Sequence, residues 1–425
     1  MQTSRTDLGD IGAPPVGVVP TVHPMLRRDR PWVDAYVTIV AGPFEMPSLE
    51  ALREAVAAVA ERRPDSRLRW GFDNAKRRWL TDRPLESIVV ERDWAGESGF
   101  GGTLLDTVTN DVSLEPPLTL VRYPNHFGMK MSHSLGDGLI FVSVVAAALL
   151  TAVSGEVIPW PTVAGGRLPL LRAGLRTFAR KPALVRATLR DRVQLNAEEP
   201  HGPSRPWQRS RRAICLSLPP EKSDEIYSWA ARYTPGGSRF TIQTALLLRA
   251  LRRVGMRISD DVRVMVDLRA YLGSGLIDGN FFAGVPMAIN WDMTPQEIAA
   301  IVKTTKATGR PLANQLMTSV RLGLAPAAPT TAEDGRLPQV TFSYLGSPPQ
   351  VEWLPYISGH RPIYAASVEP GGPHGLTFIQ GHCRGHMILN ACFHDNVVDR
   401  ATVQTAMDLV GDDPIGLLSE QVATA

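Results

Sequence analysis

A histidine and an aspartate four residues apart are the side chains of this sequence best placed for chemistry. They lie in the run Ser132-His133-Ser134-Leu135-Gly136-Asp137-Gly138, between a strand-like segment and a long apolar one. An imidazole titrates near neutral pH, so it can take a proton from a hydroxyl or amine nucleophile. Gly138 lets the backbone approach a reacting centre closely, and a helix that starts there favours developing negative charge. The pattern makes His133 a candidate general base.

A purely structural role for the same residues is the alternative. His133 would then be a hydrogen-bonded core histidine beside a helix cap, and Asp137 would serve the first helical turn. The two interpretations differ in whether the imidazole can be reached from solvent.

The segments around the motif predict an α/β arrangement in the first part of the chain. A helix is predicted behind Pro47-Ser48 and ends at Pro64, and a hairpin is predicted over 119–131. The run 138–153 is apolar at nearly every position, which is typical of a buried helix and too short to span a bilayer. Further strands are predicted at 34–40, 67–72 and 87–91.

The rest of the chain has a similar mixture of elements. Pro and Gly clusters near 159–166 and 201–206 mark breaks, and a basic helical segment lies between them at 168–193. Because 425 residues exceed the usual size of one hydrophobic core, we expect two lobes joined by a crossover. A helix is predicted at 240–254, with strands at 213–218, 262–268, 285–290, 339–344, 376–383 and 386–393.

Bulk composition excludes several classes of protein. Hydrophobic residues make up 44% and charged residues 20%, which is ordinary globular composition. A formal charge of +3 gives no reason to expect nucleic acid as a partner. The three cysteines form no CxxC pair and are too few for a disulfide framework, so a reducing cytoplasm fits best. The first twenty residues lack the pattern of a signal peptide, and we do not expect export by the usual route.

The motif and several other segments resemble condensation domains and related CoA-dependent acyltransferases. The run 132–138 resembles their HHxxxDG motif, and the segments together span residues 32 to 400. The others follow in family order at 61–69, 241–247, 266–269, 279–282 and 342–346, with a closing hairpin that ends at Phe393-His394-Asp395.

The resemblance implies roles for the residues of the motif. His133 would be the general base for acyl transfer from a thioester. Asp137 would point away from the substrate and pair with Arg269 from the other lobe, and with Gly138 this pair would hold the loop in shape. For Arg269 the alternative is a surface residue that closes a strand.

Two positions depart from the family pattern. Ser132 stands where condensation domains usually carry the first histidine, and Tyr344 stands where related strands often have asparagine. Ser132 argues against peptide condensation more than against acyl transfer, because many alcohol acyltransferases keep only HxxxD. Ser132, Asn280 and Ser343 are candidate substrate or oxyanion contacts, while Asn280 and Ser343 could instead satisfy the backbone of turns.

The resemblance also implies the fold and the partition of the chain. We expect an α/β fold of two chloramphenicol-acetyltransferase-like lobes, which form a pseudo-dimer with a channel between them and His133 at its middle. Residues 1–31 would be a flexible arm, 32–160 the N-terminal lobe carrying HxxxDG, 161–205 a basic crossover and 206–425 the C-terminal lobe.

By the same resemblance, the chain would move an acyl group to a hydroxyl or amine of a small or lipid-like metabolite. The donor substrate would be acyl-CoA or acyl-phosphopantetheine on a carrier protein, with no metal, no tightly bound cofactor and no nucleic acid. The setting would be natural-product or lipid-ester biosynthesis in the cytoplasm. An amide-forming condensation enzyme acting on carrier-bound partners, and a catalytically inactive protein that recruits a partner, are the alternatives.

The basic segment between the lobes is a further candidate for binding. Its cations could meet an acidic carrier protein, CoA phosphates or an anionic membrane in peripheral contact, or they could form a solvated face with packed stems. They are Arg172, Arg176 and Arg180, with Lys181, Arg186 and Arg190.

A cluster near the end of the chain contains residue types that bind zinc. His382, Cys383 and His386 lie close together in sequence. A hairpin would send His382 and Cys383 to opposite faces of a sheet, and the ordered spacing of metal motifs is missing. We therefore predict no metal site.

Overall fold

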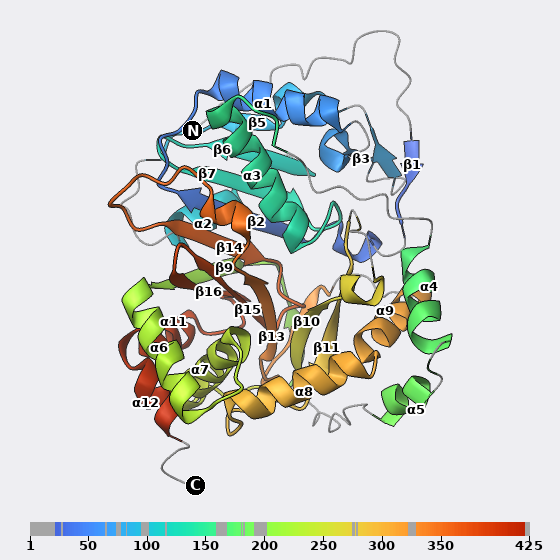
Figure 1. Cartoon of the computed structure of the whole chain (residues 1–425), viewed down its shortest axis with the longest axis vertical. Helices are drawn as coiled ribbons and strands as arrows, with labels where there is room; N and C mark the ends of the chain where they lie inside the picture. The colour runs from blue at the N-terminus through green and yellow to red at the C-terminus, as the bar shows by residue number, and fades with distance from the viewer. Residues whose placement is uncertain are drawn as a thin grey trace.

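Two lobes, each built around its own sheet, lie one above the other along the long axis of the molecule (Figure 1). The expectation of a two-lobed α/β fold is confirmed. The computed structural model describes residues 22–26, 29–63, 66–73, 78–81, 83–94, 102–114, 117–158, 168–179, 181, 183–190, 202–273, 277, 279–321 and 329–420.

The N-terminal lobe holds a five-stranded sheet with helices on both faces. Alternation along β2 sends Ile39 and Val40 in opposite directions. Ile39 joins the core beneath α1 (Leu49–Arg62) and α3 (Gly138–Ser154), and Val40 joins the core beneath α2 (Gly102–Asn110). The strands, in spatial order, are β14 (Ile363–Val368), β2 (Tyr36–Gly42), β7 (Phe127–Ser132), β6 (Leu118–Arg122) and β5 (Val89–Glu91).

The C-terminal lobe holds a six-stranded sheet. The central strands β10, β13 and β15 run parallel, and the rings of Phe342 and Phe378 stack at 5.6 Å in the core beneath them. The spatial order is β11 (Phe282–Met287), β10 (Val262–Asp267), β13 (Gln339–Gly346), β15 (Gly375–Cys383), β16 (His386–His394) and β9 (Arg211–Leu218). The helices of this lobe are α6 (Pro220–Tyr233), α7 (Arg239–Arg253), α8 (Pro295–Ala307), α9 (Arg310–Arg321), α11 (Arg400–Asp412) and α12 (Pro414–Ser419).

One strand from the second half of the chain belongs to the first lobe's sheet. β14 pairs antiparallel with β2, from Ile363 opposite Gly42 to Val368 opposite Val37. The short helix α10 (Pro349–Glu352), which precedes β14, packs against α3. The sequence analysis placed no strand here, because a short run that is buried on both faces shows no alternation. The chain therefore crosses into the first lobe after β13 and returns with β15.

The elements on either side of the motif are those predicted. The hairpin over 119–131 is formed by β6 and β7, and the apolar run becomes the 17-residue helix α3. Gly155, with φ of 72°, ends α3 in the left-handed conformation that glycine adopts without strain. The catalytic candidate thus sits in a short loop between two rigid, buried elements.

One prediction of local structure was wrong, and a second was confirmed. The strand expected at 67–72 is a 3-10 turn at Arg67–Arg69 followed by β3 (Gly71–Asp73), because Arg67 turns inward to bind the motif loop. The basic segment is helical, as predicted, and consists of α4 (Pro169–Gly174), a π-helical turn at Leu175–Ala179 and α5 (Ala183–Arg190).

Three short strands outside the large sheets form a small sheet of their own, and two more form a pair. β1 (Val22–Pro24) lies in the segment expected to be a flexible arm and pairs with β4 (Arg78–Leu80), which pairs with β3. β8 (Ser204–Pro206) pairs with β12 (Thr331–Glu333). Residues 1–21 and 27–28 of the expected arm lie outside the described residues.

Within the described part of the chain, no helix has the length and apolar character to cross a membrane.

A buried charge cluster joins the two lobes. Arg211 of β9 donates to the carbonyl oxygen of Tyr36 and to Thr38 Oγ1 (3.3 Å), both in β2. Its Nη1 lies 3.6 Å from a carboxylate oxygen of Glu369, the residue that follows β14. Burial opposes ionisation of Glu369, but His394 and the arginines hold the pKa of its carboxyl below the ordinary value.

Replacement of Arg211 by leucine should destabilise the protein by about 2 to 3 kcal/mol, because it removes the bonds from β9 to β2 and one of the cations beside the Glu369 carboxylate, while Arg209 stays 3.2 Å from that carboxylate. Arg252→Leu removes the partner of Asp292 from a pair that is more than half exposed, and should cost about 1 kcal/mol or less. Urea unfolding followed by circular dichroism compares the two variants. Equal midpoints for both would show that the cluster does not hold the lobes.

Candidate active site

The motif loop is tied to the segment that leads into β2. The Ser132 hydroxyl donates to the carbonyl oxygen of Val33 at 2.9 Å, and the His133 amide donates to the carbonyl oxygen of Ala35 at 2.7 Å. Ser132 Oγ also lies 2.7 Å from Ser134 Oγ. The Ser132 side chain is fully buried, so its contacts hold the loop and give no sign of a substrate contact.

Asp137 and Arg269 meet across the two lobes. Arg269, in the turn that follows β10, donates from Nη1 to Asp137 Oδ2 at 2.9 Å and from Nη2 to Asp137 Oδ1 at 3.1 Å. The Phe281 amide donates to the same carboxylate at 3.0 Å. The Asp137 side chain makes no capping bond to the first turn of α3. Its oxygens thus face the C-terminal lobe and do not serve the helix that they precede.

Arg67 is a second clamp on the loop, which the sequence analysis did not identify. Its Nη1 donates to the carbonyl oxygens of Ser134 at 3.0 Å and Leu135 at 3.3 Å, and lies 3.1 Å from Asp29 Oδ2. The guanidinium rests on Gly279, where a Cβ would approach it to 2.8 Å and where φ is 96°. Glycine is therefore required at this position. Arg67 lies within the segment 61–69 that resembles the family, which was the only sequence signal for it.

Three aromatic side chains enclose the imidazole of His133. Ring centroids lie 4.7 Å away for Trp32, 5.0 Å for Phe141 and 5.3 Å for Phe282. His133 is 7% exposed. None of the three rings was named from sequence, because each comes from a different element and only Phe282 lay in a family-like segment. The imidazole therefore sits in an apolar cage, and its low exposure to solvent is what the structural alternative for His133 predicts.

Asn280 fixes which ring nitrogen of His133 carries the proton. Its Nδ2 donates to the backbone carbonyl of His133 at 2.6 Å, and this bond turns Oδ1 toward Nδ1 of the imidazole, 3.0 Å away. Because an amide oxygen only accepts, Nδ1 must hold the hydrogen and Nε2 keeps its lone pair. Asn280 thus orients a ring whose free nitrogen can take a proton.

The charge state of His133 follows from its surroundings. Burial lowers the pKa of the imidazole, while its own backbone carbonyl, Asp137 and Asn280 act in the opposite direction. The net shift is downward, so the ring is neutral at neutral pH. A neutral ring is the form that a general base needs before it reacts.

Ser343 and Tyr344 lie on β13, away from the imidazole's bonding partners. Ser343 is half-buried, and within the described residues it makes no hydrogen bond to His133. The Tyr344 ring lies 5.7 Å from Phe240 and 6.5 Å from His382. Of the predicted contacts, only Asn280 bonds His133 directly.

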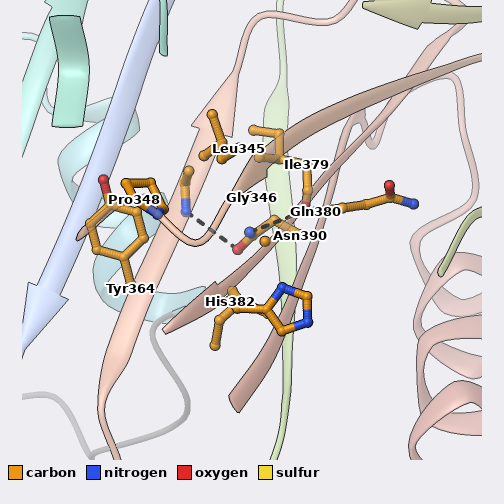
Figure 2. A pocket seen from close by; sticks show the side chains of 11 residues that line it. Leu345, Gly346, Pro348, Tyr364, Ile379, Gln380, His382 and Asn390 are labelled. Carbon is orange, nitrogen blue, oxygen red and sulfur yellow. Dashed lines mark hydrogen bonds between the residues drawn. The ribbon is translucent and has the colours of Figure 1, made fainter. Parts of the chain in front are cut away.

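A pocket lies next to the motif, on the far side of Leu345. A Cβ on Gly138 would come within 2.8 Å of Leu345 Cδ2, so this side chain is the wall between the pocket and the start of α3. In Figure 2, Gln380 and His382 extend away from Tyr364 and Pro348. The pocket is lined by Leu345, Gly346, Pro348, Tyr364, Ala366, Ile379, Gln380, Gly381, His382, Ile388 and Asn390.

Asn390 links the two lobes beside this pocket. Its Oδ1 accepts from the Ala366 amide at 3.3 Å, and its Nδ2 donates to the Ile379 carbonyl at 3.4 Å (Figure 2). Ala366 belongs to β14 in the N-terminal lobe's sheet, and Ile379 to β15 in the other sheet. The pocket therefore lies where the two sheets meet.

The residues considered for zinc point apart, as predicted. Nε2 of His382 and the Tyr227 hydroxyl share a hydrogen bond of 2.7 Å. Cys383 donates to the Tyr356 hydroxyl at 3.3 Å from the other face of β15. Burial, with the Arg239 cation, lowers the pKa of His382 to about 4. No group of three metal-binding side chains occurs among the residues that the structure describes.

Comparison with known proteins gives the fold. No protein-family profile and no curated protein sequence matches the chain. Polyketide synthase associated protein 5 from Mycobacterium tuberculosis is 14% identical, with a TM-score of 0.57 over 96% of this chain and 100% of that one. The condensation domain of the Monacolin K polyketide synthase MokA is 15% identical, with a TM-score of 0.59 over 94% of this chain and 97% of that one.

A third solved structure with this fold holds a bound ligand. TRI101 from F. sporotrichioides, complexed with coenzyme A and T-2, is 12% identical, with a TM-score of 0.56 over 93% of this chain and 98% of that one. At these identities the likeness shows the fold. The chain has the two-lobed fold of the condensation domains and of TRI101.

Arg269→Lys keeps a positive charge but loses the two parallel bonds to Asp137, so we expect a loss of about 2 kcal/mol in stability. Amide hydrogens of 133–138 should also exchange faster with deuterium. Arg253→Lys, at an exposed pair with Glu420, is the matched control. If Arg269→Lys and the control behave alike in both measurements, the pair does not hold the loop.

Proposed function

We propose that the chain is an acyltransferase that moves an acyl group from a thioester to a hydroxyl or amine, with His133 as general base. The observation that carries the proposal is the contact between Asn280 and His133, because it places the proton on Nδ1 and leaves Nε2 with its lone pair at the junction of the two lobes. Asp137 and Arg269 serve as positioning residues, and so does Arg67.

The chemistry uses only groups of this chain and of its substrates. Nε2 takes the proton as the nucleophile attacks the thioester carbonyl, which gives a tetrahedral intermediate and an imidazolium. The C–S bond then breaks, and the imidazolium returns the proton to the leaving thiolate. Acyl-CoA or an acyl-phosphopantetheine arm would supply the thioester, in keeping with the coenzyme A that TRI101 binds in its structure.

The aromatic cage implies a step before chemistry. Trp32 covers the imidazole from a short turn whose neighbour Asp29 is held by Arg67. Substrate would therefore have to displace Trp32 or Phe282 to reach Nε2. Removal of water from the same space would then strengthen the electrostatic interactions around the reacting atoms.

Release of free thiol from a panel of acyl-CoAs and acyl carrier proteins, with alcohols and amines as acceptors, tests the proposal. His133→Ala should lower the rate by about 10² to 10⁴-fold. His360→Ala, which removes an exposed histidine, should leave it unchanged. Equal rates for His133→Ala and wild type would refute the catalytic role and favour a protein that only recruits a partner.

The same panel separates the two enzymatic candidates. Turnover of CoA donors with alcohols supports ester formation, whereas turnover confined to carrier-bound amines supports amide-forming condensation.

The pH dependence of kcat/KM tests the role of Asn280. The acidic limb of the kcat/KM profile should have its midpoint below the ordinary pKa of a histidine, because burial lowers the pKa of His133. Asn280→Ala removes a bond that raises this pKa, so it should move the limb lower still and cost about tenfold in rate. Asn280→Asp places a carboxylate against Nδ1 and should move the limb upward. Profiles that coincide for all three proteins would contradict the assignment.

A further inference from the structure

The crossover between the lobes is fixed to the C-terminal lobe by its inner face. We call residues 168–190 the crossover arm; it contains α4, the π-helical turn and α5, at the edge of the molecule (Figure 1). A Cβ on Gly174 would lie 3.1 Å from Leu316 of α9, and the Thr188 hydroxyl donates to the Thr308 carbonyl at 2.6 Å. Arg176 Nη1 donates to the Leu272 carbonyl at 3.2 Å. The arm therefore has a packed side and a free side.

The free side of the arm carries large apolar residues. Leu168, Leu171 and Leu175 are 68%, 50% and 58% exposed, and Val185 of α5 is 45% exposed. The spacing of three and four residues places the leucines on one side of the helix. Packing within the chain does not account for them, since the opposite side of the arm already makes the contacts with α9. Among the described residues, four of the twelve exposed large hydrophobic side chains lie on this arm.

The charge of the arm has one sign. Residues 168–190 contain six Lys and Arg and no Asp or Glu, although the whole chain carries a formal charge of only +3. Arg172 is next to the exposed Leu171 in the chain, and Arg186 is next to Val185, whereas the guanidinium of Arg176 is on the packed side against Leu272 and Gly273. Arg180 lies outside the described residues. In the part of the chain that the structure describes, none of the arm's cations forms an ion pair. The free side therefore offers apolar and cationic groups interleaved.

We propose that this side of the arm docks onto an anionic phospholipid surface, with the leucines in the interface and the cations against the headgroups. Interleaved leucine and arginine side chains match the two components of such a surface. A second copy of the chain would bring like charges together, and a free polyanion would leave the leucines in water. Leucines that project from the edge of the molecule suit a fluid lipid layer, which adapts to their shape. The contact would be peripheral.

Flotation of the full chain with vesicles tests this docking. The protein should float with phosphatidylcholine vesicles that contain phosphatidylglycerol and not with phosphatidylcholine alone, and added salt should weaken binding. Leu171→Gln with Leu175→Gln, or Arg172→Glu with Arg186→Glu, should each weaken binding at least tenfold. The matched controls are Val112→Gln, at a side chain that is 93% exposed, and Arg257→Glu, an exposed cation outside the arm.

Four results would overturn the docking proposal. They are no flotation of the wild type, equal flotation with neutral vesicles, arm variants that float like the controls, and arm variants that lose only turnover of a carrier-bound donor. The last would assign the surface to an acidic carrier protein. His133→Ala should float like wild type. The docking proposal can therefore hold even if the catalytic proposal fails.

A fluorescent probe on the arm gives a second measurement, which reports whether the labelled side chain enters the lipid layer. Leu171→Cys labelled with an environment-sensitive fluorophore should shift to the blue with anionic vesicles, and Val112→Cys should not. The native cysteines are buried or half-buried, so the label reports the new site. Identical spectra for both positions would count against insertion.

Discussion

The ion pair between Asp137 and Arg269 is the constraint on which the site depends. A carboxylate that is almost fully buried must be matched by a cation with good geometry, since an unpaired charge there would cost several kcal/mol. Asp137 belongs to the first lobe and Arg269 to the second, so the motif loop takes its shape only when the lobes are together. The general base and its support are thus properties of the junction and not of either lobe alone.

Four consecutive residues on the second lobe complete the motif loop of the first. Gly279 accommodates Arg67, Asn280 bonds His133, the Phe281 amide binds Asp137, and the Phe282 ring packs against the imidazole. A shift of this segment by one residue would break all four contacts at once. This explains how two lobes that meet through several separate strands still hold a single ring nitrogen in one orientation.

The sequence predicted those parts of the molecule that depend on local pattern. The hairpin before the motif, the buried helix after it and most strands of the second lobe follow from short-range apolar spacing, and the resemblance supplied the meeting of Asp137 with Arg269. It did not predict β14, Arg67 or the cage around His133. Each of these depends on contacts between residues far apart in the chain, and a buried arginine or a half-buried tryptophan has no local pattern that distinguishes it from an exposed one.

Hydrogen bonds connect the crossover arm to the motif loop, so binding at the surface of the arm bears on the position of the proposed general base. Arg176 bonds the Leu272 carbonyl, and its guanidinium covers Gly273, where a Cβ could not fit. Leu272 follows directly on the turn that begins with Arg269, and Arg269 holds Asp137. Three linked contacts therefore run from the outer arm to the motif loop. Whatever binds the arm lies on an element that contacts the support of the general base, so the proposed docking surface and the proposed catalytic centre are connected through one set of hydrogen bonds.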